Sequence, residues 1–243
     1  MQKKDKKNIT KRWKHKLGVL VVTAAILTLA AVEQTWGLSS LWKGIWEKDV
    51  IIAIDAGHGG ADPGAISQNE AVLEKDVNLA IAVKLQGYLQ EAGYTVVMTR
   101  TEDEDLAGDT DGRRKTADMK ERIRVIEEAK SDLMISIHQN SFPEEKYHGP
   151  QVFFQSHSEE AAGLAMLVQG ELNVFSAPGN SRQAKSGGDY YILKNAPMTA
   201  ILVECGFVSN PEEAALLKSD SYQRKIAWGI YSGMEKYLQS AGL

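Results

Sequence analysis

Short apolar runs and longer amphipathic segments alternate along most of the chain. The apolar runs predict strands at residues 50–54, 94–99, 132–137, 150–155, 190–193 and 199–204. Apolar residues at four-residue spacing from Leu73 to Leu89 predict a helix over 72–91, which ends before Gly93. This alternation favours a single α/β domain with a twisted, mostly parallel sheet of about six strands and helices on both faces.

Three more helices are predicted in the second half of the chain. Met119, Ile123 and Ile126 mark the first, the sequence SNPEE at 209–213 starts the second, and residues 221–239 form the last. The polar segment EDEDLAGDTDGRRKTADMK precedes the first of these helices and predicts a surface loop of about fifteen residues. A solvated charge run is the simplest interpretation of this loop, and a functional loop is the alternative.

The first 48 residues have a different character. Residues 1–16 contain eight Lys or Arg and one acid, and residues 17–32 contain no charge. This pattern predicts a basic cytoplasmic flank (1–16), a signal anchor or signal peptide (17–38) and a connector (39–48), before a catalytic domain at 49–243. The absence of a clear cleavage site favours an anchor, and we expect the domain on the extracytoplasmic side of the membrane.

Charge and cysteine content narrow the function. Without the basic flank, 28 − 8 = 20 basic and 32 − 1 = 31 acidic residues remain, a net charge near −11. Such an acidic body excludes nucleic acid as the expected partner. Cys205 is the only cysteine, so no disulfide forms within the chain.

Polar residues stand where several apolar runs end. His58 and His138 follow two predicted strands, Glu74 begins the next helix, and Glu204 closes a third apolar run. Because the carboxyl ends of parallel strands meet at one sheet edge, these side chains are expected to lie together. Two imidazoles and two carboxylates fit one zinc ion (Zn²⁺) and a general base.

Each of these residues also has a simpler interpretation. The glycine-rich DAGHGG could cradle a phosphate, although it lacks the GxGxxG spacing and the Walker lysine. Glu74 could merely complement the helix dipole, His138 could be a rim residue, and Glu204 a buried ion-pair partner. Strand alternation turns Cys205 away from Glu204 into the core, which argues against a nucleophilic thiol. His148 and His157 are expected on the surface.

The segments IDAGHGGADPGA, LEKDVNLA, SIHQNS and ILVECGFVSNPEE together resemble the zinc-dependent N-acetylmuramoyl-L-alanine amidases, the type 3 amidase family, over residues 50–240. The resemblance implies zinc ligands at His58, Glu74 and His138 and a catalytic role for Glu204. It also implies substrate contacts from Asn140, Arg182 and Lys185. Asp55 is expected to orient a ligand histidine.

The resemblance implies hydrolysis of the amide between N-acetylmuramic acid and L-alanine in peptidoglycan. Only ten residues, SFPEEKYHGP, separate Asn140 from the next strand, so the long helix that blocks the zinc in some relatives is not expected. The layout is similar to the sporulation and germination amidases of spore-forming Firmicutes, with a membrane or spore-associated protein as a candidate activator. Another exported zinc peptidase and a catalytically silent wall-binding module are the alternatives.

Overall fold

The computed structural model of the protein describes residues 22–23, 28, 48–68, 72–108 and 113–242. The predicted flank at 1–16, and almost all of the predicted anchor and connector, lie outside these residues. Val22, Thr23 and Thr28 are helical. Among the described residues, no helix has both the length and the apolar character needed to span a membrane.

Residues from Lys48 onward form one α/β domain built on a single six-stranded sheet with the order β2-β1-β3-β6-β4-β5. The first four of these strands run parallel, and β4 and β5 run in the opposite direction. The strands are β1 (Lys48–Ala56), β2 (Tyr94–Met98), β3 (Leu133–Asn140), β4 (Gln151–Phe154), β5 (Lys185–Ser186) and β6 (Thr199–Phe207). The predicted mostly parallel sheet is therefore confirmed.

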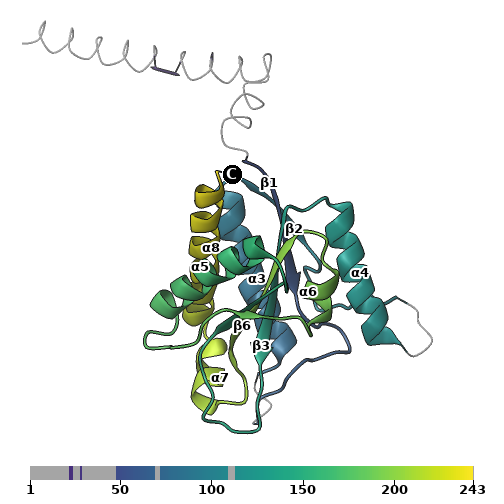
Figure 1. Ribbon diagram of the computed structural model, residues 1–243, viewed down its shortest axis with the longest axis vertical. Helices are drawn as coiled ribbons and strands as arrows, with labels where there is room; N and C mark the ends of the chain where they lie inside the picture. The colour runs from purple at the N-terminus through teal and green to yellow at the C-terminus, as the bar shows by residue number, and fades with distance from the viewer. Residues whose placement is uncertain (1–21, 24–27, 29–47, 69–71, 109–112, 243) are drawn as a thin grey trace, which may run out of the picture. The chain divides into compact units, whose positions relative to one another are not determined.

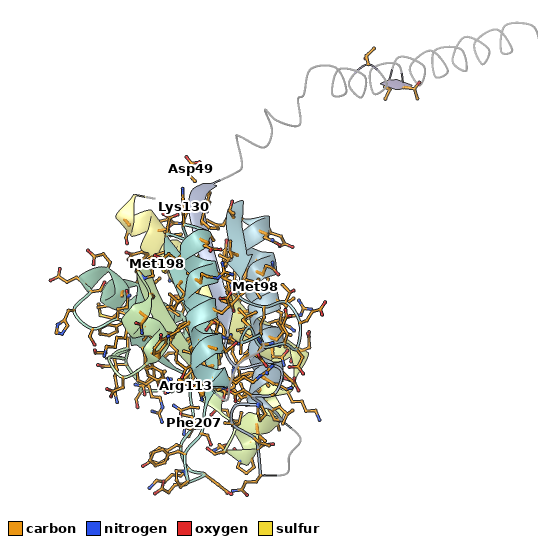
Figure 2. All side chains as sticks on the ribbon, turned by 90° about the vertical axis from the view of Figure 1, so that its right-hand side faces the viewer. Asp49, Met98, Arg113, Lys130, Met198 and Phe207 are labelled. Atoms are coloured by element: carbon orange, nitrogen blue, oxygen red, sulfur yellow. The ribbon has the colours of Figure 1, made fainter. Side chains whose placement is uncertain are left out.

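Helices cover both faces of the sheet (Figure 1). One face carries α3 (Glu74–Glu91), α5 (Glu159–Phe175), α7 (Pro211–Leu217) and α8 (Asp220–Ala241), and the other carries α4 (Arg114–Glu128) and α6 (Tyr191–Asn195). Figure 2 looks onto the second face, where α4 crosses the front of the sheet between Arg113 and Lys130. The start of α4 and Phe207, the last residue of β6, lie at the same end of the domain.

The structure corrects three sequence predictions. Residues 190–193 are not a strand, because Ile192 and Leu193 pack into the core as part of the short helix α6, and β5 is the edge strand instead. The connection between β2 and α4, residues 99–113, has the predicted length of about fifteen residues, but residues 114–120, which the sequence pattern places in the polar segment before the helix, belong to α4. Helix α5 was not predicted. Its outer face is apolar, with Met166 and Val174 exposed, so it lacks the usual amphipathic pattern.

Two buried arginines hold the end of β1. Arg122 of α4 donates from Nη1 to Asp55 Oδ1 (2.8 Å) and to the Ala56 carbonyl (2.7 Å), and from Nη2 to the His58 carbonyl (2.7 Å). Arg100, which follows β2, donates from Nε to the same Ala56 carbonyl (2.8 Å). Backbone carbonyls beyond the end of a strand have no partner in the sheet, so when they are buried they need other hydrogen-bond donors. Arg122 and Arg100 supply these donors here.

Asp55 is buried with a full set of donors. Its carboxylate accepts from Arg122, from Thr99 Oγ1 (2.9 Å) and from Ser136 Oγ (2.6 Å). Burial alone would raise the pKa of Asp55, but the positive charge of Arg122 and these hydrogen bonds lower it to about 2. The stabilisation from this group is therefore complete above the usual aspartate pKa of about 3.8 and is lost as the pH falls toward 2.

We expect Arg122→Met to lower the free energy of unfolding by about 3–5 kcal/mol, because Asp55 stays buried without its ion-pair partner. In the parent, the free energy of unfolding should fall as the pH is lowered from 4 to 2, because the pKa of Asp55 is depressed in the folded state. The variant should lose this pH dependence. Denaturant unfolding at several pH values measures both effects. Lys120→Met, an exposed position on the same helix, serves as the control and should change stability by less than about 0.5 kcal/mol. A similarly small change in Arg122→Met would contradict the assignment.

Candidate metal centre

Strand alternation brings the polar residues of three strands to one face of the sheet. The face that carries α4 and α6 is packed by Ala53, Met134 and Leu202. His138 lies four residues after Met134 on β3, and Glu204 lies two residues after Leu202 on β6, so both side chains point to this same face. His138 and Glu204 are also direct register partners on the adjacent strands β3 and β6. Both side chains therefore stand at the carboxyl end of the sheet, beside the cleft under α4 and α6.

His58 sits in a tight turn after β1. Its φ of 62° is in the left-handed region, and Arg122 fixes the turn through the His58 carbonyl. A Cβ on Gly57 would lie 2.3 Å from the ring of His138, so this position needs glycine. On the other side, His58 Nδ1 lies 2.9 Å from Asp62 Oδ2, which leaves Nε2 to face the centre of the site.

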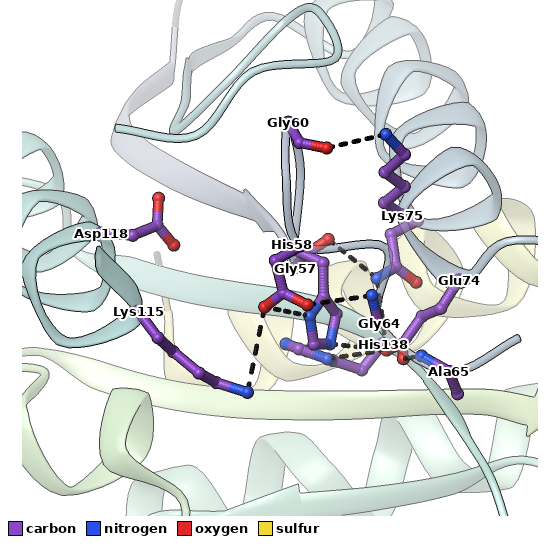
Figure 3. Close-up of polar contacts among 12 residues, drawn as sticks. Gly57, His58, Gly60, Gly64, Ala65, Glu74, Lys75, Lys115, Asp118 and His138 are labelled. Atoms are coloured by element: carbon purple, nitrogen blue, oxygen red, sulfur yellow. Dashed lines mark hydrogen bonds and ion pairs between the residues drawn. The ribbon is translucent and has the colours of Figure 1, made fainter. Parts of the chain in front are cut away.

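Glu74 connects the two histidines (Figure 3). Its Oε1 lies 3.2 Å from His58 Nε2 and 3.0 Å from His138 Nδ1. The backbone N–H of Gln139 donates to Oε1 (3.0 Å) and that of Ala65 donates to Oε2 (2.7 Å). Burial would raise the pKa of Glu74, but the hydrogen bonds and charges of the two histidines lower it strongly, so the carboxylate is ionised.

These three side chains fit a zinc ion. One nitrogen of each histidine and one Glu74 oxygen all lie within 4.8 Å of one another. The ligand atoms of a tetrahedral zinc ion are separated by about 3.3 Å, because zinc–nitrogen and zinc–oxygen bonds are about 2.0–2.2 Å long. The two histidine–glutamate distances, 3.2 and 3.0 Å, are close to that separation. Two histidines and one carboxylate also form a known ligand set of catalytic zinc.

Glu204 is placed for acid–base chemistry. It is 7% exposed, and Tyr190 donates its hydroxyl to Oε1 at 3.3 Å. Oε2 is buried and accepts no hydrogen bond from the residues that the structure describes. Burial is the main cause that raises the pKa of Glu204, to about 7, and the nearby charge of Glu74 acts in the same direction. A carboxylate with such a pKa can both take and release a proton near neutrality.

A cleft of about 410 Å³ opens over His58 and His138. The start of α4 forms one wall through Lys115 and Met119, and Tyr190 and Tyr191 form the other. The connection between β3 and β4 is ten residues long and contains no helix, as expected from the sequence.

The prediction that Asp55 orients a ligand histidine is wrong, because its hydrogen bonds go to Thr99, Arg122 and Ser136. Asp62 lies beside His58 instead, and the sequence analysis missed it. The DPG turn after the glycines was the available signal, since the backbone N–H of Gly64 donates to Asp62 Oδ1 (3.1 Å).

Two of the three predicted substrate contacts lie apart from the histidines. Arg182 and Lys185 line a second groove, of about 610 Å³, at the far edge of the sheet. Asn140 ends β3, where its carbonyl accepts from the Val208 N–H (2.9 Å), and it lines neither groove. Cys205 is buried in the core on the opposite face from Glu204, as predicted. His148 and His157 are exposed, which was also predicted.

Comparison with known proteins identifies the family. The family model described as N-acetylmuramoyl-L-alanine amidase matches residues 52–236. The germination-specific N-acetylmuramoyl-L-alanine amidase of Bacillus subtilis is 40% identical over 195 residues, which cover 79% of this chain and 81% of that protein. Among solved structures, the CwlD amidase from Clostridioides difficile, in complex with the GerS lipoprotein, is 37% identical with a TM-score of 0.76.

The CwlD match covers 79% of this chain and 100% of that chain. The catalytic domain of CwlV, an N-acetylmuramoyl-L-alanine amidase from Bacillus (Paenibacillus) polymyxa, is 29% identical with a TM-score of 0.66 and covers 78% of this chain and 98% of that one. The family match extends over the sheet and the residues at its carboxyl edge. The chain therefore belongs to the N-acetylmuramoyl-L-alanine amidases and is a peptidoglycan hydrolase.

Proposed function

We propose that this amidase is zinc-dependent, that His58, Glu74 and His138 hold one zinc ion, and that Glu204 is the catalytic acid and base. The observation that carries the proposal is the unpartnered, buried Oε2 of Glu204 on the strand beside His138. A buried carboxylate oxygen without a donor is costly unless another molecule uses it. During hydrolysis this oxygen would interact first with the attacking water, as a general base, and then with the departing amine, as a general acid.

The reaction needs few residues. A zinc ion, when bound, polarises the scissile carbonyl and acidifies water. Glu204 accepts a proton from the attacking water, and the bond between the lactyl carbonyl of N-acetylmuramic acid and the nitrogen of L-alanine breaks. Glu204 then returns the proton to that nitrogen, so L-alanine leaves as a free amine. Tyr190, whose hydroxyl donates to Glu204 Oε1, keeps the carboxylate in place.

The spore cortex is the proposed site of action. Support comes from the relative in Bacillus subtilis, which is named as germination-specific. The proposed role is removal of stem peptides during cortex maturation, ahead of germination. A different exported zinc peptidase is the rival, and it would cut between amino acids instead of freeing an N-terminal L-alanine from an intact glycan.

A protein partner is also proposed. The CwlD relative was solved with a lipoprotein, and a membrane or spore-associated protein that prefers the metal-bound form of this chain would raise its zinc affinity by the same factor. Zinc titration of the purified domain with and without such a lipoprotein tests this. Tight zinc binding and full activity of the domain alone would remove the need for an activator.

Removal of any one proposed ligand, by His58→Ala, Glu74→Ala or His138→Ala, should weaken zinc binding more than about 100-fold. Loss of a residue that only hydrogen-bonds to a ligand typically weakens metal binding by about 10- to 100-fold. Asp62→Ala should weaken zinc binding by about 10- to 100-fold, because Asp62 contacts His58 and only orients it. Titration against a zinc indicator measures both. His157→Gln, an exposed histidine remote from the site, is the control, and equal affinity in all variants would remove the metal assignment.

Glu204→Gln should keep the fold and the zinc but lose about 10²–10⁴ in turnover, because the amide cannot accept a proton at neutral pH. Mass spectrometry of digested peptidoglycan, with and without a chelator, measures the release of peptides with N-terminal L-alanine. Cys205→Ser should remain active, since that thiol is buried on the other face of the sheet. Glu204→Gln activity within a few-fold of the parent would refute the catalytic role.

The domain is proposed to work outside the cytoplasm, held by residues 17–38 in the membrane. The uncharged run at 17–32 after eight basic residues supports this orientation, because a basic flank stays cytoplasmic. Protease added to protoplasts should therefore digest the domain of the full-length chain. Complete protection of the domain, under conditions where a known extracytoplasmic protein is degraded, would contradict the orientation.

A further inference from the structure

The second groove, at the β4–β5 edge of the sheet, is distinctly basic. The loops at 146–151 and 179–185 enclose it. Its lining contains two lysines, one arginine and one histidine and no Asp or Glu: Lys146, His148, Arg182 and Lys185. The chain as a whole carries more acids than bases, 32 against 28, so a groove whose lining carries basic but no acidic residues is a local departure from its overall charge.

Two of the cations in this groove are free to bind a ligand. Lys146 and Lys185 are exposed, and neither forms an ion pair with another residue of the described part of the chain. Arg182 is more constrained. Its Nε donates to the His148 carbonyl (2.9 Å), its Nη1 donates to Gln151 Oε1 (3.2 Å), and its guanidinium lies over the ring of Phe207. Arg182 therefore shapes the groove, and the lysines supply its available charge.

A buried carboxylate near the groove is already occupied. Glu213 accepts from the backbone N–H groups of Gly149 (2.9 Å) and Phe207 (2.7 Å). Its charge interacts with His148 and Arg182. Glu213 is thus engaged by backbone donors, and no salt bridge joins it to Lys146 or Lys185 in the described part of the chain.

The groove begins next to the catalytic carboxylate. Gln151, which lines it, is the direct register partner of Glu204 across β4 and β6. In the strand order β1-β3-β6-β4-β5, His58 follows the end of the first strand, His138 lies on the second and Glu204 on the third, and the groove lies beside the last two. A ligand that extends from the histidines past Glu204 along this edge therefore enters the basic groove.

The direction of the substrate follows from the proton transfer, and this step rests on the proposed function. Glu204 must reach the nitrogen of the scissile amide, whereas the carbonyl faces the histidines. The peptide side of that bond therefore points toward β4 and β5, and the muramoyl side points toward the first cleft. Of the two halves of the substrate, the stem peptide carries the carboxylates. We propose that the second groove binds the stem peptide and that Lys146 and Lys185 recognise its carboxylates.

Two synthetic muramyl peptides of equal length test the proposal, one with free side-chain and α-carboxylates and one with the same groups amidated. The parent should cleave the acidic peptide about three- to tenfold better in kcat/KM, since each exposed ion pair contributes about 1.4- to fivefold. Lys146→Gln/Lys185→Gln should lose this preference, mainly through KM, and cleave the amidated peptide as the parent does. High salt should reduce the preference of the parent as well.

Lys225→Gln, an exposed lysine of α8 away from the groove, is the matched control and should keep the full preference. A parent enzyme that cleaves both peptides equally, or a double variant that retains the preference, would overturn the groove assignment and leave the amidase proposal intact. Equal losses on both peptides would also overturn it, because they indicate a structural role. Failure of the parent on both peptides and on purified peptidoglycan would instead count against the proposed function.

Discussion

The buried contact between Asp55 and Arg122 is the interaction on which the site depends. Arg122 reaches from α4 to the end of β1 and binds three acceptors in succession along the chain, including the His58 carbonyl. A lysine could not replace it, because the planar guanidinium offers five donors in a fixed arrangement. A buried ion pair adds little net stability compared with a packed apolar pair, so its main effect here is to fix one conformation of the turn.

The proposed metal ligands are oriented by other groups of the protein. Asp62 holds His58, and the backbone N–H groups of Ala65 and Gln139 hold the two oxygens of Glu74. A bound cation would thus meet side chains already directed toward one point, which reduces the ordering that binding must pay for. Gly57 permits this arrangement, since any Cβ there would overlap the His138 ring.

The sequence predicted the residues at strand ends well and their supporting contacts poorly. His58, His138 and Glu204 stand out because each interrupts or closes an apolar run. Glu74 could be added because it begins the helix that follows His58. Arg122 has no such signal. Its helix reads RKTADMKERIRVIEE, in which a buried arginine looks like its solvated neighbours, and its partner Asp55 lies 67 residues away. The run YYIL at 190–193 is compatible with either a strand or a helix by its pattern alone. It forms the helix α6 because Ile192 and Leu193 pack into the core beneath α4.

The two faces of the sheet explain why the site is open on one side. The face covered by α3, α5 and α8 carries the larger core, and close packing there is shown by Gly233, where a Cβ would lie 2.4 Å from Val168. Of the described helices, α4 and the five-residue α6 alone cover the other face, so the cleft at the carboxyl ends of the strands remains open there. Because alternation directs His138 and Glu204 to this thinly covered face, the core on the other face is preserved while His138 lines the cleft and Glu204 lies beside it.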